Sequence, residues 1–287
     1  MNLKMFFIGV AFLAVLSSAP ALRAFELHAE RSSPFDLAVT GRLEGVPAGE
    51  TRFLRRADLE QLPTRVLTLK GEFVPGEQEV TVVMLNDVLE KLPRMADADA
   101  LIANCTDKYA SIYTNKFMAE YKPFLVLAIN GKGPETWPPE GLTFNPGPFV
   151  ISIAKHLAPN APELLDAVNK RPWGVDTLEF INYAERFDPW YSGALKEASP
   201  FLAEGRDIWV NSCFSCHNAA QHELGGTKAM RPIQILAMHA AFNPEYFKTY
   251  VREPKKINPM ATMEAYPNYT DKQLDAVIAF LKATMAQ

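Results

Sequence analysis

Two cysteines and a histidine in the run Cys213-Phe214-Ser215-Cys216-His217 have the clearest chemistry in the chain. Two cysteines separated by two residues and followed at once by a histidine form the spacing that attaches a c-type haem. On one helical turn the two thiols can reach the two vinyl groups of a single porphyrin, and the next residue can offer an imidazole nitrogen to the iron. We therefore predict thioether bonds from Cys213 and Cys216 and iron ligation by His217.

Other uses of a Cys-x-x-Cys pair fit the sequence less well. A zinc site needs about four ligands, and the only other cysteine, Cys105, lies far upstream. A thioredoxin-like pair follows a strand, whereas the pattern from Pro200 to the cysteines is helical. If both thiols of the pair bind haem, Cys105 has no partner and the chain forms no internal disulfide. We expect Cys105 to act as a small buried hydrophobe.

The elements that must position this motif divide into two predicted domains. A chain of 287 residues with 48% hydrophobic and 22% charged residues can bury two ordinary cores. The pattern is mixed α and β before Asp188 and helical after Pro200, and the join is rich in proline and glycine. We predict an α+β domain at residues 25–190 and an all-α domain at 196–287. The net charge of -4 argues against a general nucleic-acid binder.

Alternating apolar residues and turn signals give the elements of residues 25–190. Predicted strands are 35–41, 65–71, 79–83, 99–105, 109–113, 124–129, 149–153 and 177–183. Two short helices are predicted at 56–62 and 85–92, and residues 132–148 form a loop rich in glycine and proline. The order is therefore that of a mixed α and β domain.

The N-terminus has the features of a signal peptide, which we place at residues 1–24. Lys4 is followed by an uncharged apolar run from Met5 to Leu16 and then by small residues suited to cleavage after Ala21 or Ala24. The run is shorter than the ~20 residues that span a bilayer. We expect an exported, periplasmic protein, which agrees with the motif because bacteria attach haem c outside the cytoplasm.

The N-terminal part resembles the sulfite-oxidase-like molybdopterin-binding domain. The resemblance rests on Leu37-Ala38-Val39-Thr40-Gly41, Ala57-Asp58-Leu59, Leu85-Asn86-Asp87-Val88-Leu89, Asp107-Lys108-Tyr109, Leu127-Ala128-Ile129-Asn130-Gly131 and Gly147-Pro148-Phe149-Val150. These segments span about half of the chain, and each is weakly specific alone.

One departure from that family concerns the metal. The family has a molybdenum-ligating cysteine on a strand that matches Thr64 to Phe73, where this sequence has none. Cys105 falls later in the pattern. We expect surface or core roles for His28 and His156. The resemblance therefore implies a fold kept without molybdopterin, which docks a partner or positions the haem domain.

The C-terminal part resembles class I cytochrome c. That family packs a first and a last helix across each other, and Gly205, Trp209 and Phe280 match its glycine and aromatic positions at the crossing. The last helix is predicted to begin at Thr270, a capping residue. The resemblance implies an all-α domain that holds one covalent haem c.

The sixth iron ligand is predicted from the loop before the last helix. In cytochrome c a methionine there precedes an aromatic residue and a helix starting at Ser or Thr, and Met263 matches that register. Met260 is the alternative methionine. His222 and His239 are further candidates, for ligation by two histidines. A vacant sixth position, open to peroxide or a small gas, is also left open.

Pro232 resembles the family proline whose carbonyl accepts a hydrogen bond from the proximal imidazole. That bond would fix the ring of His217 and raise its basicity. The sequence has Arg231 where the family usually has glycine.

Basic residues gather just before the methionine loop, where we expect the haem edge to be exposed. They are Lys248, Arg252, Lys255 and Lys256. Such a rim would steer an acidic redox partner, and a solvated helix face is the equally weighted alternative.

These features predict outer-sphere electron transfer by a periplasmic c-type cytochrome with His217 and Met263 on the iron. Its partners would be a periplasmic redox protein, a dehydrogenase or an oxidase, with no nucleic acid and with membrane contact only through a partner. We expect a carrier and not a catalyst. The alternative is a molybdopterin-dependent enzyme, similar to sulfite dehydrogenase, that passes electrons to its own haem.

Overall fold

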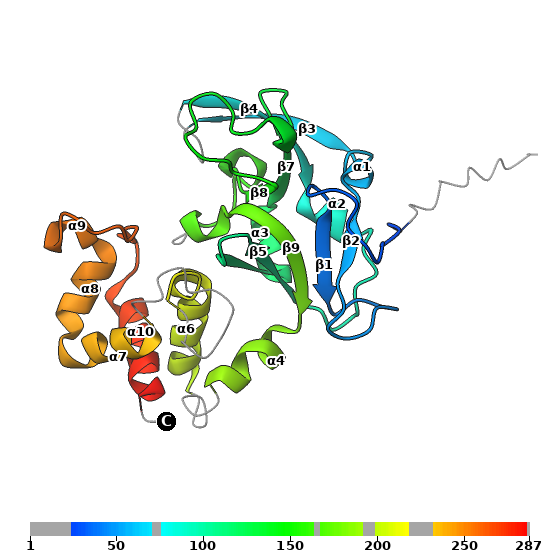
Figure 1. Cartoon of the computed structure of the whole chain (residues 1–287). Helices are drawn as coiled ribbons and strands as arrows, with labels where there is room; N and C mark the ends of the chain where they lie inside the picture. The colour runs from blue at the N-terminus through cyan, green and yellow to red at the C-terminus, as the bar shows by residue number, and fades with distance from the viewer. Residues whose placement is uncertain (1–23, 71–75, 164–166, 192–198, 218–231, 286–287) are drawn as a thin grey trace, which may run out of the picture.

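The computed structural model describes residues 24–70, 76–163, 167–191, 199–217 and 232–285. They form a sheet region, residues 24–191, and a helical region, residues 199–285, that lie side by side (Figure 1). The predicted signal peptide falls outside the described residues except for Ala24. None of the described helices is both long enough and apolar enough to span a membrane.

The sheet region contains nine strands and several short helices. The strands are β1 (Leu37–Gly41), β2 (Arg52–Leu54), β3 (Thr64–Lys70), β4 (Glu77–Met84), β5 (Ala100–Cys105), β6 (Ala110–Thr114), β7 (Phe124–Ile129), β8 (Phe149–Ser152) and β9 (Trp173–Ile181). The α-helices are α1 (Arg56–Leu59), α2 (Leu85–Leu89), α3 (Asn115–Tyr121) and α4 (Tyr183–Phe187). The 3-10 helices are η1 (Pro134–Thr136), η2 (Lys155–Leu157), η3 (Ala167–Lys170) and η4 (Asp188–Tyr191).

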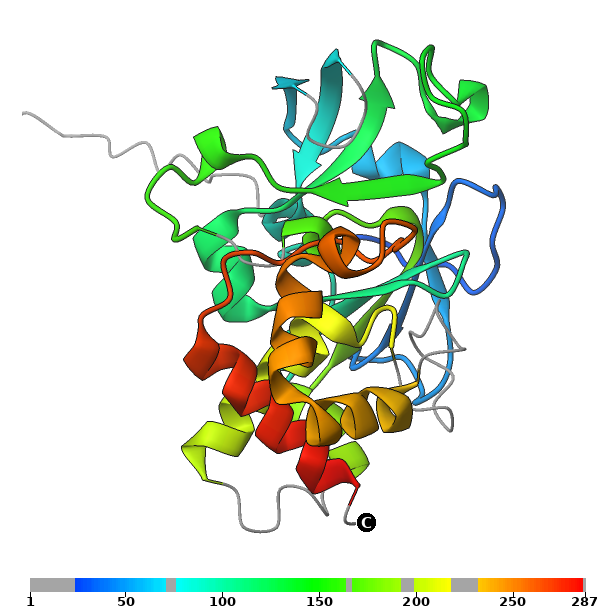
Figure 2. The same cartoon turned by 90° about the vertical axis from the view of Figure 1, so that its left-hand side faces the viewer.

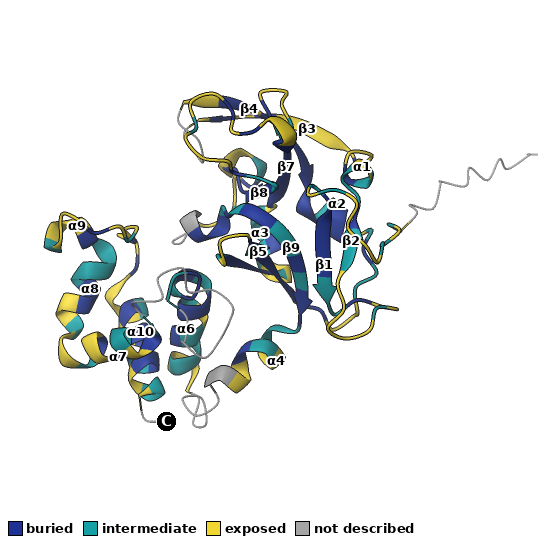
Figure 3. Ribbon diagram, viewed as in Figure 1, coloured by how far each residue is buried: buried dark blue, intermediate teal, exposed yellow. Residues whose placement is uncertain are grey.

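Strand β9 connects the parts of the sheet. The main order is β2-β1-β9-β8-β7-β4-β3, and β5 pairs with both β9 and β6. Strand β9 runs parallel to β1 and antiparallel to β5 and β8. Its central position explains why none of its residues is exposed, and Figure 3 shows it in dark blue and teal.

Strand β5 has apolar residues on both of its faces because it lies between two apolar cores. Leu101 and Ala103 belong to the core of the sheet region. Ala100 and Ile102 belong to a second apolar cluster that includes Trp209 of the helical region. Successive side chains of a strand point to opposite faces, so β5 presents one face to each core. The helices accordingly lie directly in front of the strands in Figure 2.

The helical region holds a small helical bundle. Its elements are α6 (Pro200–Ile208), the π-helix η5 (Trp209–Cys213), α7 (Ile233–Phe242), α8 (Pro244–Arg252), α9 (Pro254–Ile257) and α10 (Asp271–Thr284). The first and last of these cross at Gly205, where an added Cβ would lie 2.1 Å from the carbonyl oxygen of Ala276 and 2.9 Å from Cβ of Phe280. The predicted crossing at Gly205 and Phe280 is therefore confirmed.

Most of the predicted elements are present. The eight predicted strands correspond to β1 and β3–β9, although β9 begins earlier, at Trp173. Strand β2 and helices α3 and α4 were not predicted. Strand β9 ends at Ile181, and Tyr183, which was predicted to lie in that strand, begins α4. Helix α10 begins after Thr270, whose hydroxyl accepts the Gln273 N–H while the Gln273 side chain accepts the Thr270 N–H. This is a capping box, and the predicted helix start is confirmed.

We expect Gly205→Ala to lower the free energy of unfolding by about 1–3 kcal/mol, because the extra methyl group must push α6 and α10 apart. Urea unfolding monitored by circular dichroism measures the loss. The neighbouring change Glu204→Ala, on the same helix, is the control and should stay within about 0.5 kcal/mol of the parent. Equal effects of the two substitutions would contradict the close crossing.

A second prediction concerns Asp36, which is 3% exposed and accepts hydrogen bonds from Arg55 and from the N–H groups of Ser32 and Ser33. Burial alone would raise the pKa of Asp36, but these bonds lower it from 3.8 to about 2. The stabilisation is complete above the unfolded-state pKa and is lost as the pH falls through the folded-state pKa.

We therefore expect Asp36→Asn to lower the free energy of unfolding at pH 7 by about 1.5–3 kcal/mol, the size of a hydrogen bond to a charged group. The difference from the parent should shrink between pH 4 and pH 2. Urea unfolding at several pH values measures it, and a difference that does not change with pH would contradict the assigned role.

Candidate haem site

The two cysteines and His217 lie on the turn that follows helix α6. The chain passes from α6 into the wider π-helix η5, in which the N–H of Phe214 donates to the carbonyl of Trp209 at 2.9 Å. The N–H groups of Cys216 and His217 then both donate to the carbonyl of Cys213, at 3.1 and 2.9 Å. π-Helical segments often occur at functional sites, and here the segment leads directly into the motif.

All three side chains line a cavity of about 810 Å³ between the helices. Cys213, Cys216 and His217 are half-buried, so each is held by the protein and still open to the cavity. Most of the other walls are apolar and include Trp209, Ile208, Leu236, Phe247, Val251, Leu274 and Val277. A largely apolar cavity with a few polar groups is typical of a cofactor site of this size class. The donor set and the lining fit a porphyrin.

Both candidate methionines line the same cavity, but their burial differs. Met263 is half-buried and packs against the buried cluster of Tyr266, Tyr269 and Leu274. Met260 is 85% exposed. A side chain that is already held against the wall loses less conformational freedom when it binds. The difference favours Met263 as the ligand.

The other predicted residues take different places. His239 is exposed on α7 and lines the cavity, so it stays an alternative ligand. His222 and Arg231 lie outside the described residues. Pro232 precedes α7, and its carbonyl accepts the N–H of Ile235 at 3.0 Å. The predicted bond from His217 to Pro232 stays a prediction.

The loop that carries Met263 is tied to the cysteine turn by tyrosines that the sequence interpretation did not single out. The hydroxyl groups of Tyr269 and Ser212 are hydrogen-bonded to each other, directly before Cys213. The N–H of Tyr266 donates to the carbonyl of Val251 at 3.0 Å. The two sides of the cavity are therefore fixed to one another by hydrogen bonds.

The sheet region also contributes to the cavity, which the sequence did not predict. Tyr109 and Asn169 are among the lining residues. The hydroxyl groups of Tyr109 and Tyr266 lie 3.1 and 3.0 Å from Oδ1 of Asn169. Nearby, Oγ of Ser215 donates to the carbonyl of Ala110 at 2.5 Å. The only sequence feature that pointed to Tyr109 was the segment Asp107-Lys108-Tyr109, through its resemblance to the sulfite-oxidase-like domain.

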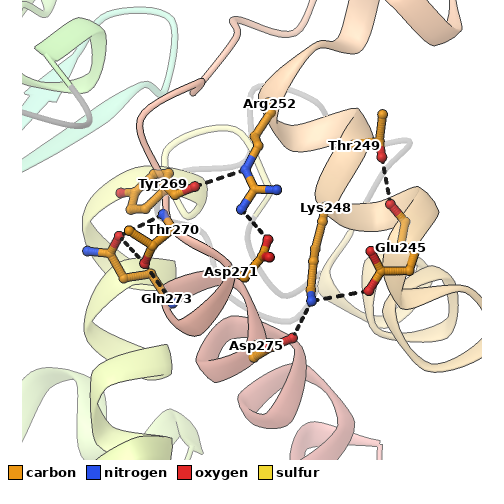
Figure 4. A network of polar contacts seen from close by, with 9 residues as sticks. All are labelled: Glu245, Lys248, Thr249, Arg252, Tyr269, Thr270, Asp271, Gln273 and Asp275. Atoms are coloured by element: carbon orange, nitrogen blue, oxygen red, sulfur yellow. Dashed lines mark hydrogen bonds and ion pairs between the residues drawn. The ribbon is translucent and has the colours of Figure 1, made fainter.

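The predicted basic rim is largely neutralised by acidic residues of α10, as Figure 4 shows. Lys248, whose side chain is 9% exposed, lies 2.7 Å from Asp275 and 3.2 Å from Glu245. The hydrogen bond to Asp275 raises the pKa of Lys248. Arg252 lies 2.6 Å from Asp271, and the pKa of that carboxyl is lowered by the hydrogen bond from Arg252. These two cations join α8 to α10 and do not form a free basic surface.

Lys256 also lies in an ion pair, 2.8 Å from Glu253, whereas Lys255 is exposed. Three of the four basic residues are therefore paired with acidic residues, and the expectation of a basic rim that steers a redox partner is corrected. The alternative of a solvated face is also incomplete, because Lys248 is buried between two helices.

Cys105 is buried in the core of the sheet region and is 7% exposed. Burial raises the pKa of its thiol well above the usual range. A separate cavity of about 300 Å³ is lined by the adjacent Thr106, with Arg31 and Asp176, but not by Cys105. Among the described residues, no group of three His, Cys, Asp or Glu side chains is arranged to hold a metal ion.

A protein family and two known proteins are similar to parts of this chain. The family described as cytochrome c oxidase, cbb3-type, subunit III matches residues 200–281. Cytochrome c oxidase subunit 2 of Alkalihalophilus pseudofirmus is 28% identical over 112 residues, which cover 34% of this chain and 31% of that protein. The chain thus spans about a third of the length of this relative.

Among solved structures, the sulfane dehydrogenase SoxCD from Paracoccus pantotrophus is similar over 54% of this chain and 40% of its own. The TM-score is 0.37 and the identity 16%, a likeness too distant to bear on function. The match to residues 200–281 covers the cysteine turn and the crossing helices. The helical region is a cytochrome c domain, which implies haem c and a role in electron transfer.

Proposed function

We propose that the chain is a periplasmic c-type cytochrome that carries single electrons between redox partners. One observation carries this proposal: Cys213, Cys216, His217 and Met263 all line one largely apolar cavity. The motif thus shares its cavity with the thioether side chain of Met263, which supports ligation of the iron by this methionine. We assign the thioether bonds to the two cysteines, and His217 and Met263 would be the side chains that bind the iron.

Each assigned residue has a defined physical role. The two half-buried cysteines would hold the porphyrin covalently, and His217 is held by its N–H bond to the carbonyl of Cys213. A methionine sulfur favours the reduced iron and so raises the reduction potential, while the bound haem supplies the one-electron chemistry. The apolar walls exclude water, which limits the reorganisation that accompanies a change of charge. This arrangement suits a carrier better than a catalyst.

The sheet region, in this proposal, is a sulfite-oxidase-like scaffold or docking module without molybdopterin. Support comes from Cys105, which is buried in the core, has a raised thiol pKa and does not line the neighbouring open cavity. The partner would be a periplasmic redox protein, a dehydrogenase or an oxidase. The enzyme alternative requires molybdenum in the purified protein, and the first experiment below tests for it.

The first experiment measures iron and molybdenum per chain in protein matured by a haem-attaching periplasm. We expect equimolar iron, no molybdenum, and haem that stays with the chain after denaturation. The double change Cys213→Ser and Cys216→Ser should abolish covalent haem, and Cys105→Ser is the matched control that should retain it. Stoichiometric molybdenum would replace the carrier with the enzyme alternative, and a lack of iron would refute the haem assignment.

The second experiment compares the two methionines of the loop. We expect Met263→Ala to abolish the weak red-edge charge-transfer band of a methionine-ligated ferric haem and to lower the reduction potential, because the thioether ligand is lost. Met260→Ala, at an exposed position, should retain both properties. The reverse pattern would move the ligand to Met260, and a band unaffected by either change would overturn methionine ligation from this loop.

A further inference from the structure

We infer that Asn169, a residue of the sheet region, is a positioning residue for the haem site and holds the Met263 loop against the cysteine turn. The inference rests on the proposed function, since it concerns the ligand assigned there. Asn169 lines the cavity and is 3% exposed. It is far in sequence from both segments that it joins.

The contacts of Asn169 use the hydrogen-bonding capacity of its amide in one orientation. Its Nδ2 group donates to the carbonyl oxygen of Ser212, the residue before Cys213. A carbonyl can only accept, so the amide nitrogen must face Ser212. Oδ1 then faces the hydroxyl groups of Tyr109 and Tyr266, at 3.1 and 3.0 Å, and accepts from both. The three segments around the cavity thus converge on one side chain.

These hydrogen bonds bear on the methionine because Tyr266 follows Met263 by three residues and packs with it in one cluster. Tyr266 is buried, and its hydroxyl, which donates to Asn169, also lies 3.4 Å from the carbonyl oxygen of Ser212. A buried hydroxyl that loses its hydrogen-bond partners is unfavourable. The loop therefore resists any movement that pulls Tyr266 away from Asn169.

Asn169 is itself fixed by strand β6. The Ser111 hydroxyl donates to the backbone carbonyl of Asn169, and the Tyr113 hydroxyl donates to that of Lys170 at 3.1 Å. The Lys170 ammonium donates to the carbonyl of Ile112 and to Oδ1 of Asn211, the latter at 3.1 Å. Helix η3 is thus anchored on the sheet on one side and on the π-helix on the other. The sheet region sets the position from which Asn169 acts.

The test is the affinity of added imidazole for the ferric haem of the full-length protein, measured from the absorption spectrum. Imidazole must displace the methionine, so a loosened loop binds it more tightly. We expect Asn169→Leu and Tyr266→Phe each to raise the affinity about tenfold and to lower the reduction potential. The double variant should bind imidazole only slightly more tightly than either single variant, because both substitutions remove the same hydrogen bond.

Tyr183→Phe is the matched control, because it removes a tyrosine hydroxyl bond between the two regions, to Asp207 at 3.2 Å, and Tyr183 does not line the cavity. We expect its imidazole affinity to stay within twofold of the parent. Parent-like affinity and potential in both Asn169→Leu and Tyr266→Phe would overturn the inference, as would an equal change in Tyr183→Phe. If Asn169→Leu fails to fold, Tyr266→Phe decides alone, since it removes only one hydroxyl group.

The parent spectrum separates this inference from the proposed function. A parent without the charge-transfer band would overturn the Met263 assignment. The role of Asn169 would then be judged from the reduction potential alone, where a shift in Asn169→Leu that Tyr183→Phe lacks supports it and no shift overturns it.

Discussion

The apolar contact between β5–β6 and the helix that carries the cysteines is the interaction on which the rest of the structure depends. One face of this hairpin, with Ile102 and Ile112, shares a buried cluster with Trp209 and Phe214 of the helical region. Burying a large apolar side chain contributes about 1.5–3 kcal/mol. Several such side chains hold the two regions in one arrangement, whereas small polar interfaces allow domains to move.

The polar contacts at the cavity are possible only because this apolar contact fixes the distances. The Ser215 hydroxyl reaches a carbonyl of β6, and Asn169 reaches a carbonyl of the π-helix. Such bonds lose most of their strength with small displacements. A sheet that pairs β9 with three other strands moves little, so it offers a firm base for side chains that surround the proposed haem.

The sequence predicted those features that depend on local pattern and failed where tertiary contacts decide. Alternation predicted the strands, and the capping residue Thr270 predicted the start of α10. Strand β2 has only three residues, too few to show a period. Asn169 and Tyr266 meet through packing of segments distant in sequence, and no periodicity or spacing connects them. Their place at the cavity was therefore beyond sequence reasoning.

The charged segment before the methionine loop is a second case in which a tertiary contact decides and the local pattern does not predict the outcome. Lys248 and Arg252 are one helical turn apart on α8, and so are Asp271 and Asp275 on α10. Counting charges along one segment suggested a basic surface, but the two sets face each other and neutralise. The matching spacing is visible in the sequence, but it leads to ion pairs only because α8 packs against α10.

The contact between the sheet region and the helical region gives a physical reason for their occurrence in one chain. Outer-sphere electron transfer is favoured when the ligands and the walls around the iron move little as the charge changes. A bundle of short helices secures its own ligand loop at few points, whereas here Tyr266 is also bonded to a residue anchored on a strand. The turn of the β5–β6 hairpin thus carries both Cys105, which is buried in the core of the sheet region, and Tyr109, which borders the proposed haem cavity. On this argument the sheet region is retained for the rigidity it gives to the proposed haem site.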